Sequence, residues 1–196
     1  MLKETINGID LVFETNNKIF SPQNLDKGTL AMLQLCNLSE NNKLLDLGCG
    51  YGVVGVYAAK IIGAHNVTMS DIDEKCVQIS QKNAELNGVG GENGVTIIHS
   101  DGFKNIDDKG FTLILSNPPY HADFSVPKHF IEKGFNRLAI GGKLLMVTKR
   151  KDWYKNKITA IFGGVKISEI DGYYIFCAEK RGVRYANSKP TRGSQA

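Results

Sequence analysis

Short apolar runs and longer amphipathic segments alternate along the chain from about residue 43 onward. The short runs have the length of buried strands, which we expect at 43–48, 66–71, 95–101, 111–119 and 143–149. The longer segments have the apolar period of helices, which we expect at 53–62, 74–88 and 126–142. Strands that alternate with helices at this spacing form crossover units, so the pattern predicts an α/β fold with a mostly parallel sheet.

This pattern changes near the C-terminus. Two strand-like runs within 164–180 meet at Asp171-Gly172, a dipeptide typical of two-residue hairpin turns. We therefore expect an antiparallel hairpin at one edge of the sheet. Beyond about Arg184 the chain is rich in Lys, Arg, Ser, Gly and Pro, which predicts a disordered basic tail over 184–196.

The N-terminal segment 1–42 precedes the regular alternation. Its pattern predicts a small hairpin at about 9–20 and a helix over roughly 25–36. A chain of 196 residues has the length of one α/β domain and is too short for two domains of typical size. We expect a single domain over 1–183, with residues 1–42 as an N-terminal extension.

Charge is distributed unevenly along the chain, whose net charge is +4. Residues 1–146 hold 13 Lys and Arg against 16 Asp and Glu, whereas residues 147–196 hold 11 against 4, a net of +7. A basic C-terminal quarter on an acidic body suits a polyanionic partner such as RNA. A solvated lysine-rich face explains the same charges equally well.

The four cysteines form no C-x-x-C pair and have no histidine at ligand spacing: Cys36, Cys49, Cys76 and Cys177. This spacing argues against a structural metal site and a disulfide scaffold, and favours a reducing cytoplasm. The polar N-terminus lacks the apolar core of a secretory signal. Because no apolar run approaches the roughly 18 residues of a membrane span, we expect no membrane partner.

A glycine-rich sequence, DLGCGYG, lies at 46–52 between the first of these strands and its helix. Gly48 and Gly50, on either side of Cys49, allow a tight turn and a close approach to a ligand. The G-x-G-x-G spacing differs from the G-x-G-x-x-G of pyrophosphate-binding loops, so we expect a ligand without phosphates. The amides at the helix N-terminus suit the carboxylate of an amino acid, and Asp46 suits its ammonium group.

Two further acids end the next two predicted strands. Asp71 is placed to accept hydrogen bonds from both hydroxyls of a ribose. Asp101, followed by Gly102, suits an adenine amino group, and Ile72 offers the ring an apolar face. Each acid alone is more often a helix cap or a loop residue. With Asp46 they converge on the edge where open α/β sheets bind ligands, and together they describe an amino acid, a ribose and an adenine.

The fourth strand is followed by the loop Asn117-Pro118-Pro119-Tyr120. The two prolines fix φ and remove two N–H donors, so the loop presents carbonyl groups in a rigid arrangement. The side-chain oxygen of Asn117 and the carbonyl of Pro118 can both accept from one NH2 group, which aims the nitrogen lone pair at a methyl donor. Tyr120 offers a flat face for a planar base. We interpret these four residues as a catalytic loop for N-methylation.

Trp153 and Tyr154 follow a run of three cations, Lys149, Arg150 and Lys151. Aromatic side chains mixed with cations suit a nucleic-acid strand. Packing of an edge helix on the sheet explains the aromatic residues equally well.

These motifs resemble the class I S-adenosylmethionine methyltransferases, and more narrowly the small-domain methyltransferase family that includes the bacterial small-subunit ribosomal RNA guanine-N2 methyltransferases. The segments that carry the resemblance are FSPQNLDKGT (20–29), LLDLGCGYGVVGV (44–56), SDID (70–73), SDGF (100–103) and SNPPYH (116–121). The resemblance implies a Rossmann-like, seven-stranded sheet, S-adenosylmethionine as cofactor, and methylation of an exocyclic amino group in RNA, most closely guanine N2. It also implies that Thr29, with Asp26 and Gly28, packs near the amino-acid end of the cofactor, which Asn117 borders.

The sequence departs from the best-known members of this family in two respects. They carry a degenerate N-terminal copy of the domain that is absent here, so RNA binding would fall to the basic C-terminal end, to a dimer, or to a different target. Tyr120 stands where guanine-N2 enzymes often carry Phe, and Tyr is common in adenine-N6 and protein-glutamine enzymes. Two alternatives therefore stay open: a methyltransferase for a protein glutamine or a small molecule, and a non-catalytic RNA-binding assembly factor.

Overall fold

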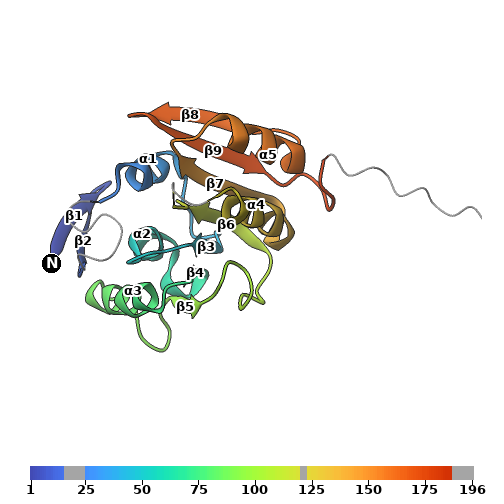
Figure 1. Ribbon diagram of the computed structural model, residues 1–196. Coiled ribbons are helices and arrows are strands. Elements are labelled where there is room, and N and C mark those ends of the chain that lie inside the picture. The colour runs from blue at the N-terminus through green and yellow to red at the C-terminus, as the bar shows by residue number, and fades with distance from the viewer. Residues whose placement is uncertain (16–24, 120–122, 187–196) are drawn as a thin grey trace, which may run out of the picture.

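The computed structural model describes residues 1–15, 25–119 and 123–186, and its centre is a seven-stranded sheet of order β5-β4-β3-β6-β7-β9-β8 (Figure 1). The strands are β3 (Leu44–Leu47), β4 (Val67–Asp71), β5 (Thr96–His99), β6 (Phe111–Ser116), β7 (Leu138–Thr148), β8 (Lys166–Ile170) and β9 (Tyr173–Glu179). Strands β3 to β7 pair in parallel, and β9 pairs antiparallel with β7 and β8. The predicted Rossmann-like sheet with a C-terminal antiparallel hairpin is confirmed.

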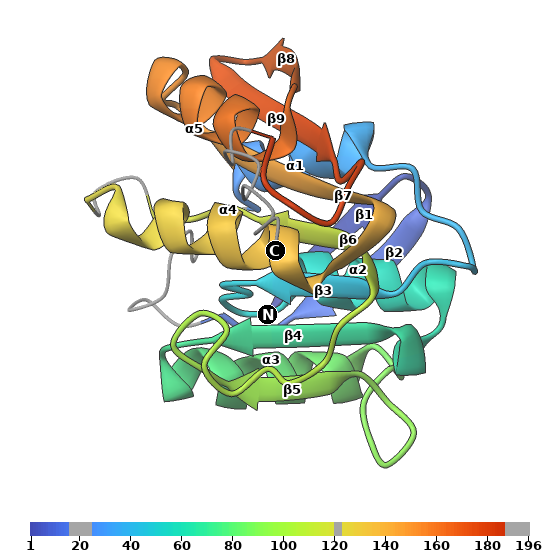
Figure 2. The ribbon, with the colours of Figure 1, turned by 90° about the vertical axis from the view of Figure 1, so that its right-hand side faces the viewer.

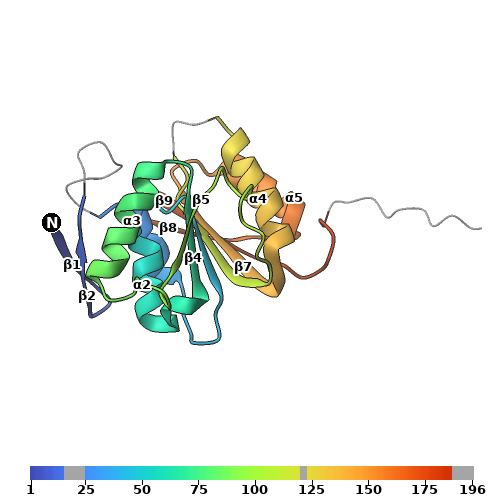
Figure 3. The ribbon, with the colours of Figure 1, turned by 90° about the horizontal axis from the view of Figure 1, so that it is seen from below.

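Helices cover both faces of the sheet (Figure 3). They are α1 (Lys27–Leu35), α2 (Val53–Ile62), the short 3-10 helix η1 (Ala64–Asn66), α3 (Glu74–Leu86), α4 (Ser125–Arg137) and α5 (Asp152–Phe162). Helices α1, α2 and α3 pack on one face, and α4 and α5 pack on the other. Because side chains alternate along a strand, neighbouring Leu44 and Leu45 enter different layers of the core.

The hairpin predicted around Asp171-Gly172 joins β8 to β9. Both turn residues have positive φ, +50° for Asp171 and +77° for Gly172. Positive φ at both central residues is the requirement of a type I′ turn, whose twist matches that of the flanking strands. The dipeptide therefore determines the turn by its local geometry.

The N-terminal hairpin lies earlier in the chain than the apolar pattern predicted. Strands β1 (Leu2–Ile6) and β2 (Ile9–Phe13) pair around a turn at Asn7-Gly8, whereas a hairpin was expected at about 9–20, of which residues 16–20 lie outside the described residues. Asn7 and Gly8 both have positive φ, and Asn-Gly is the stronger turn signal that the prediction overlooked. The hairpin packs against α2 and α3, where the amide of Asn87 exchanges hydrogen bonds with the backbone of Val12 (3.0 and 2.7 Å).

Helix α4 ends at Arg137, five residues before the end predicted for it. Residues 138–142 instead begin β7, because sheet neighbours on both sides satisfy their backbone groups. Leu138 pairs with Phe111 of β6, and the amide of Gly141 donates to the carbonyl of Lys180 beyond β9 (2.7 Å). These partners are distant in sequence, so the local helical period gave the wrong boundary.

Tyr185 and Ala186 pack onto the domain, although the tail was expected to begin at Arg184. The Tyr185 hydroxyl donates to the carbonyl of Glu132 (3.0 Å), and its ring lies edge-on to Phe135 with centroids 5.1 Å apart. The amide of Ala186 donates to the carbonyl of Ile161 (3.0 Å). Residues 187–196, the rest of the predicted tail, lie outside the described residues.

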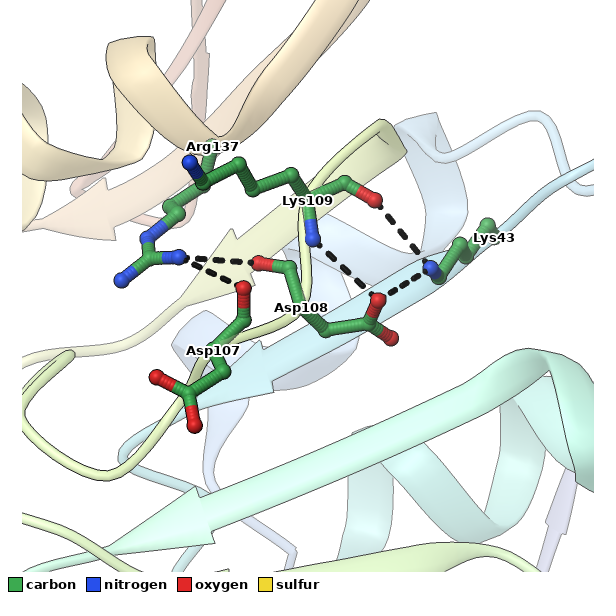
Figure 4. A network of polar contacts seen from close by, with 5 residues as sticks. All are labelled: Lys43, Asp107, Asp108, Lys109 and Arg137. Carbon is green, nitrogen blue, oxygen red and sulfur yellow. Dashed lines mark hydrogen bonds and ion pairs between the residues drawn. The ribbon is translucent and has the colours of Figure 1, made fainter.

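A polar network closes the edge of the sheet at which β3 and β6 begin (Figure 4). The ammonium of Lys43 donates to the Asp108 carboxylate (2.8 Å) and to the carbonyl of Lys109 (3.1 Å). The guanidinium of Arg137, at the end of α4, donates to the carbonyl of Asp107 (2.8 Å). These bonds fasten the amino-terminal edge of the sheet and leave the carboxyl edge for ligands.

Among the helices that the structure describes, none has the length and apolar composition of a membrane span.

Candidate active site

Figure 2 shows β3, β4, β5 and β6 side by side and running in the same direction. A cavity of about 330 Å³ opens at their carboxyl edge. The chain runs from β3 outward to β4 and β5 and then returns to β6 on the other side of β3, so the strand order reverses between β3 and β6, and this is where open α/β sheets bind ligands. Its lining includes nearly all of the site residues expected from the sequence: Thr29, Asp46, Gly48, Cys49, Gly50, Asp71, Ile72, Asp101, Gly102, Asn117, Pro118 and Pro119. Tyr120, the fourth residue of the expected catalytic loop, lies outside the described residues.

The glycine loop between β3 and α2 has a backbone that only glycine adopts readily. Gly48, Gly50 and Gly52 have φ values of +77°, +56° and +93°. The loop is held against β4, because the amides of Gly48 and Cys49 both donate to the carbonyl of Ser70 (2.9 Å each). Apart from its two chain neighbours, no atom of the described residues lies within 4 Å of the place where a Cβ on Gly50 would stand. That position is therefore open to the cavity.

Cys49 lines the cavity with a buried thiol whose pKa burial raises well above its ordinary value. The thiol is neutral under ordinary conditions and contributes a small apolar surface rather than a nucleophile.

Asp46 is a buried carboxylate at the end of β3, only 3% exposed. Its Oδ2 accepts a hydrogen bond from the amide of Gly55 in the first turn of α2 (2.9 Å). Burial raises the pKa of Asp46 to about 7, the Gly55 bond opposes the rise, and the charge of Asp71 adds to it. A cationic partner would therefore stabilise the ionised form of this carboxyl group.

Asp71 links the glycine loop to the start of α3. One carboxylate oxygen accepts from the amide of Gly50 (2.8 Å), and the other accepts from the amide of Asp73 (2.9 Å). Each carboxylate oxygen has a second acceptor position, so a diol can bind without breaking these bonds. The next residue, Ile72, lines the cavity although its side chain is 63% exposed.

Asn117 is held by two residues from the start of α1. Its Nδ2 donates to Oδ1 of Asp26 (2.6 Å) and to Oγ1 of Thr29 (2.9 Å). Asp26 caps α1 and accepts from the amide of Thr29 (2.8 Å), which fixes both acceptors. Because the amide is planar, these bonds place Nδ2 on the α1 side and give the acceptor Oδ1 the other position.

The contact between Asp26 and Asn117 was not predicted, because 91 residues separate them. The apolar wall that α4 contributes was also missed: Val126 and Phe130 line the cavity. The helical period predicts that such residues are buried and does not reveal which ligand they face. Ser70 was missed as well, and its buried Oγ has no hydrogen-bond partner within the described residues.

The cavity lining carries four acids and, among its described residues, no Lys, Arg or His. The acids are Asp26, Asp46, Asp71 and Asp101. Such a lining favours a cationic ligand. In the same described part of the chain, no group of three or more His, Cys, Asp or Glu is arranged to hold a metal ion.

Fold and site together define an S-adenosylmethionine-dependent methyltransferase, and comparisons with known proteins identify its family. Residues 10–177 match the family model of the methyltransferase small domain, and the chain belongs to that family. The uncharacterized protein YbxB of Bacillus subtilis (strain 168) is 32% identical over 177 residues, which cover 87% of each chain.

Two longer relatives are named for their activity. Ribosomal RNA small subunit methyltransferase C of Pseudoalteromonas atlantica (strain T6c / ATCC BAA-1087) is 30% identical over 83% of this chain. The solved 16S rRNA N2 methyltransferase RsmC of T. thermophilus, in complex with AdoMet and guanosine, has a TM-score of 0.83 and 26% identity over 92% of this chain. The chain spans 47% and 50% of these two proteins, about half of their length.

The cavity fits S-adenosylmethionine. This cofactor carries a sulfonium and an ammonium, which the uncompensated carboxylates of the lining suit. The open position at Gly50 leaves room for the amino-acid part beside the N-terminus of α2, and Ile72 and Phe130 supply apolar surface for a planar ring.

Proposed function

We propose that this methyltransferase acts on an exocyclic amino group of a base in RNA, and that guanine N2 of small-subunit ribosomal RNA is its target. The carrying observation is the fixed amide of Asn117, whose donor end is held by Asp26 and Thr29. A fixed acceptor at the mouth of a cofactor cavity is what an NH2 substrate needs. The activities for which the two longer relatives are named support RNA as the substrate, and so does the basic C-terminal quarter of this chain.

Within this proposal each part of the cofactor has its own residues. The open position at Gly50, in the loop of Gly48, Cys49 and Gly50, takes the carboxylate beside the N-terminus of α2, and Asp46 takes the ammonium. Asp71 accepts from the ribose hydroxyls. The adenine lies by Ile72, Asp101 and Gly102. Replacing Asp71 with Ala should weaken cofactor binding at least tenfold, and an unchanged Kd by calorimetry would remove its ribose role.

Bound S-adenosylmethionine supplies a methyl group on a positively charged sulfur. The chain prepares the acceptor: Oδ1 of Asn117 and the carbonyl of Pro118 each accept one N–H of the amine, which aims the nitrogen lone pair at the methyl carbon. The positive charge that develops on the nitrogen is stabilised by these two acceptors, and the extra proton then passes to water. Tyr120 provides the stacking face for the base.

The reaction is tested with tritiated S-adenosylmethionine and the purified protein. Unmodified ribosomal RNA, small subunits and total cell protein are offered side by side, and labelled RNA is digested to nucleosides. Label in N2-methylguanosine is the expected result. Label in protein, or in no macromolecule while the cofactor binds, would overturn the RNA assignment.

The Asn117→Ala variant tests the proposed role of Asn117 in the same assay. It loses the proposed acceptor and should slow turnover at least a hundredfold, about 2.7 kcal/mol of transition-state stabilisation. Cofactor affinity should change little, since the proposed cofactor contacts lie mainly on other loops. A variant that turns over at the wild-type rate would exclude Asn117 from the mechanism.

A further inference from the structure

We propose that a cation–aromatic surface beside the cavity holds the single-stranded RNA that flanks the target nucleotide. The surface comprises Phe124, Lys149, Arg150, Lys151 and Trp153. This inference rests on the proposed function, because it assigns a binding track to the same substrate.

The sheet places this surface next to the expected catalytic loop. Strands β6 and β7 are parallel neighbours, with Ser116 opposite Met146 in register. The loop that starts at Asn117 and the turn that starts at Lys149 therefore leave the same edge of the sheet side by side. Phe124 lies at the start of α4, two residues before Val126, which lines the cavity.

Two aromatic rings form a stacked pair on this surface. Phe124 and Trp153 lie with centroids 4.3 Å apart and planes inclined by 17°. Both side chains are half-buried, whereas the neighbouring Tyr154 is 3% exposed and packs on Phe176 of β9. Packing of α5 on the sheet accounts for Tyr154, while Phe124 and Trp153 also contact the core but keep part of their surface open. Half-open rings of this kind are stacking platforms for unpaired bases.

The three cations are exposed and are positioned by ring contacts. The Arg150 guanidinium lies 5.1 Å from the centroid of Phe124, and the Lys149 ammonium lies 4.8 Å from that of Tyr173. The Lys151 ammonium lies 5.0 Å from the centroid of Tyr174. A cation held over a ring keeps its charge directed while staying available to a phosphate. Tyr173 and Tyr174 belong to opposite core layers, so the Lys149 ammonium lies on the α1 side of the sheet edge, whereas Arg150 and Lys151 lie on the side of the stacked pair.

Neighbouring acids do not neutralise these charges. Among the described residues, no carboxylate lies within ion-pair distance of Lys149, Arg150 or Lys151. Asp123 accepts from the amide and hydroxyl of Ser125, and Asp152 lies in the first turn of α5, where a carboxylate complements the helix dipole. Uncompensated cations beside aromatic rings match a polyanion with exposed bases, which is single-stranded RNA.

Trp153 is the only tryptophan of the chain, so its fluorescence reports on this surface directly. Titration with an RNA oligonucleotide that carries an unpaired stretch of small-subunit ribosomal RNA should change the Trp153 emission. Affinity is measured separately by anisotropy of the labelled oligonucleotide at several salt concentrations. The double variant Lys149→Gln, Lys151→Gln should weaken binding about tenfold at 0.1 M salt and reduce the log–log salt slope by about 1.4, about 0.7 per lysine on a single strand.

The matched control removes the same charge elsewhere on the molecule. Lys109 precedes β6 and Lys166 begins β8, and both are exposed. The variant Lys109→Gln, Lys166→Gln should bind the oligonucleotide with the wild-type affinity and slope. Equal melting temperatures of all variants establish that the comparison is between folded proteins.

The outcomes separate this inference from the proposed function. If the wild type methylates RNA and the Lys149, Lys151 variant binds and methylates it as well as the control does, the surface is overturned and the function stands. If the wild type labels only protein but binds RNA in a Lys149- and Lys151-dependent manner, the function falls and the surface stands. An unchanged Trp153 emission on saturation with RNA also overturns the surface.

Discussion

The raised pKa of Asp46 predicts that its carboxyl group releases a proton when the cofactor binds. The carboxylate is 3% exposed, and burial raises its pKa from 3.8 to about 7. In the proposed complex the cofactor ammonium lies beside it, and an adjacent cation lowers the pKa of a carboxylate. At pH 6 the free protein thus holds a proton on Asp46 that the complex loses.

The size of the effect follows from the raised pKa. A group with a pKa of about 7 is about 0.9 protonated at pH 6 and about 0.5 protonated at pH 7. Binding should therefore release about 0.9 proton at pH 6 and about 0.5 at pH 7, and affinity should rise about fivefold between these pH values. The α-amino group of the ligand titrates near pH 8 and contributes little in this window.

Calorimetric titration in two buffers of different ionisation enthalpy measures the released protons. The Asp46→Asn variant is the control, because its side-chain oxygen can still accept from the amide of Gly55 while carrying no proton that titrates. It should bind S-adenosylmethionine more weakly and without proton release. No release from the wild type at pH 6, or equal release from the variant, would refute the assignment of Asp46 to the ammonium.

The same shift determines how the stability of the cofactor-free protein depends on pH. The folded state binds a proton on Asp46 more tightly than the unfolded state, whose pKa is 3.8. The contribution of Asp46 to the free energy of unfolding therefore decreases as pH rises from about 4 through about 7. Denaturant unfolding of the wild type at pH 5.5 and pH 8, compared with Asp46→Asn, checks this sign. A variant that keeps the full pH dependence would contradict it.

Two further substitutions test the scaffold of the site. Asp26→Ala removes the acceptor that holds the Asn117 amide and should lower kcat about 10- to 100-fold, or 1.4–2.7 kcal/mol. Asp26→Asn keeps an acceptor and should restore most of the rate. Equal rates for both variants would show that this hydrogen bond is unimportant for turnover. Gly55→Ala places a Cβ in steric overlap with Cγ of buried Met69 and should reduce the free energy of unfolding by about 1–3 kcal/mol. The control Gly164→Ala meets no atom of the described residues and should leave the denaturant midpoint unchanged.

Local patterns predicted the elements whose structure depends on near neighbours. The turn at Asp171-Gly172 has the positive φ values that its residues favour, and the glycine loop turns at Gly48 and Gly50 as expected. The acids at the strand ends also reach one cavity, because parallel strands end at a common edge. In each case the determinant lies within a few residues of the feature.

Most of the differences between prediction and structure concern segments whose partners are distant in the sequence. Helix α4 ends at Arg137 because the following residues pair with β6 and the end of β9, against the helical period of the segment. The N-terminal hairpin is an exception of another kind, since its turn at Asn7-Gly8 was visible in the sequence and was overlooked. Tyr185 likewise packs on α4 although its surroundings have the composition of a tail.

The sequence by itself determined the parallel sheet, the glycine loop and the family of this protein, because the period of apolar residues and the backbone needs of glycine and proline act locally. Only the tertiary structure brought Asp26 to Asn117, raised the pKa of Asp46, and set Phe124 beside Arg150 and Trp153. Those features arise when strands and helices far apart in the chain pack together, since burial and contact between distant residues exist only in the folded protein.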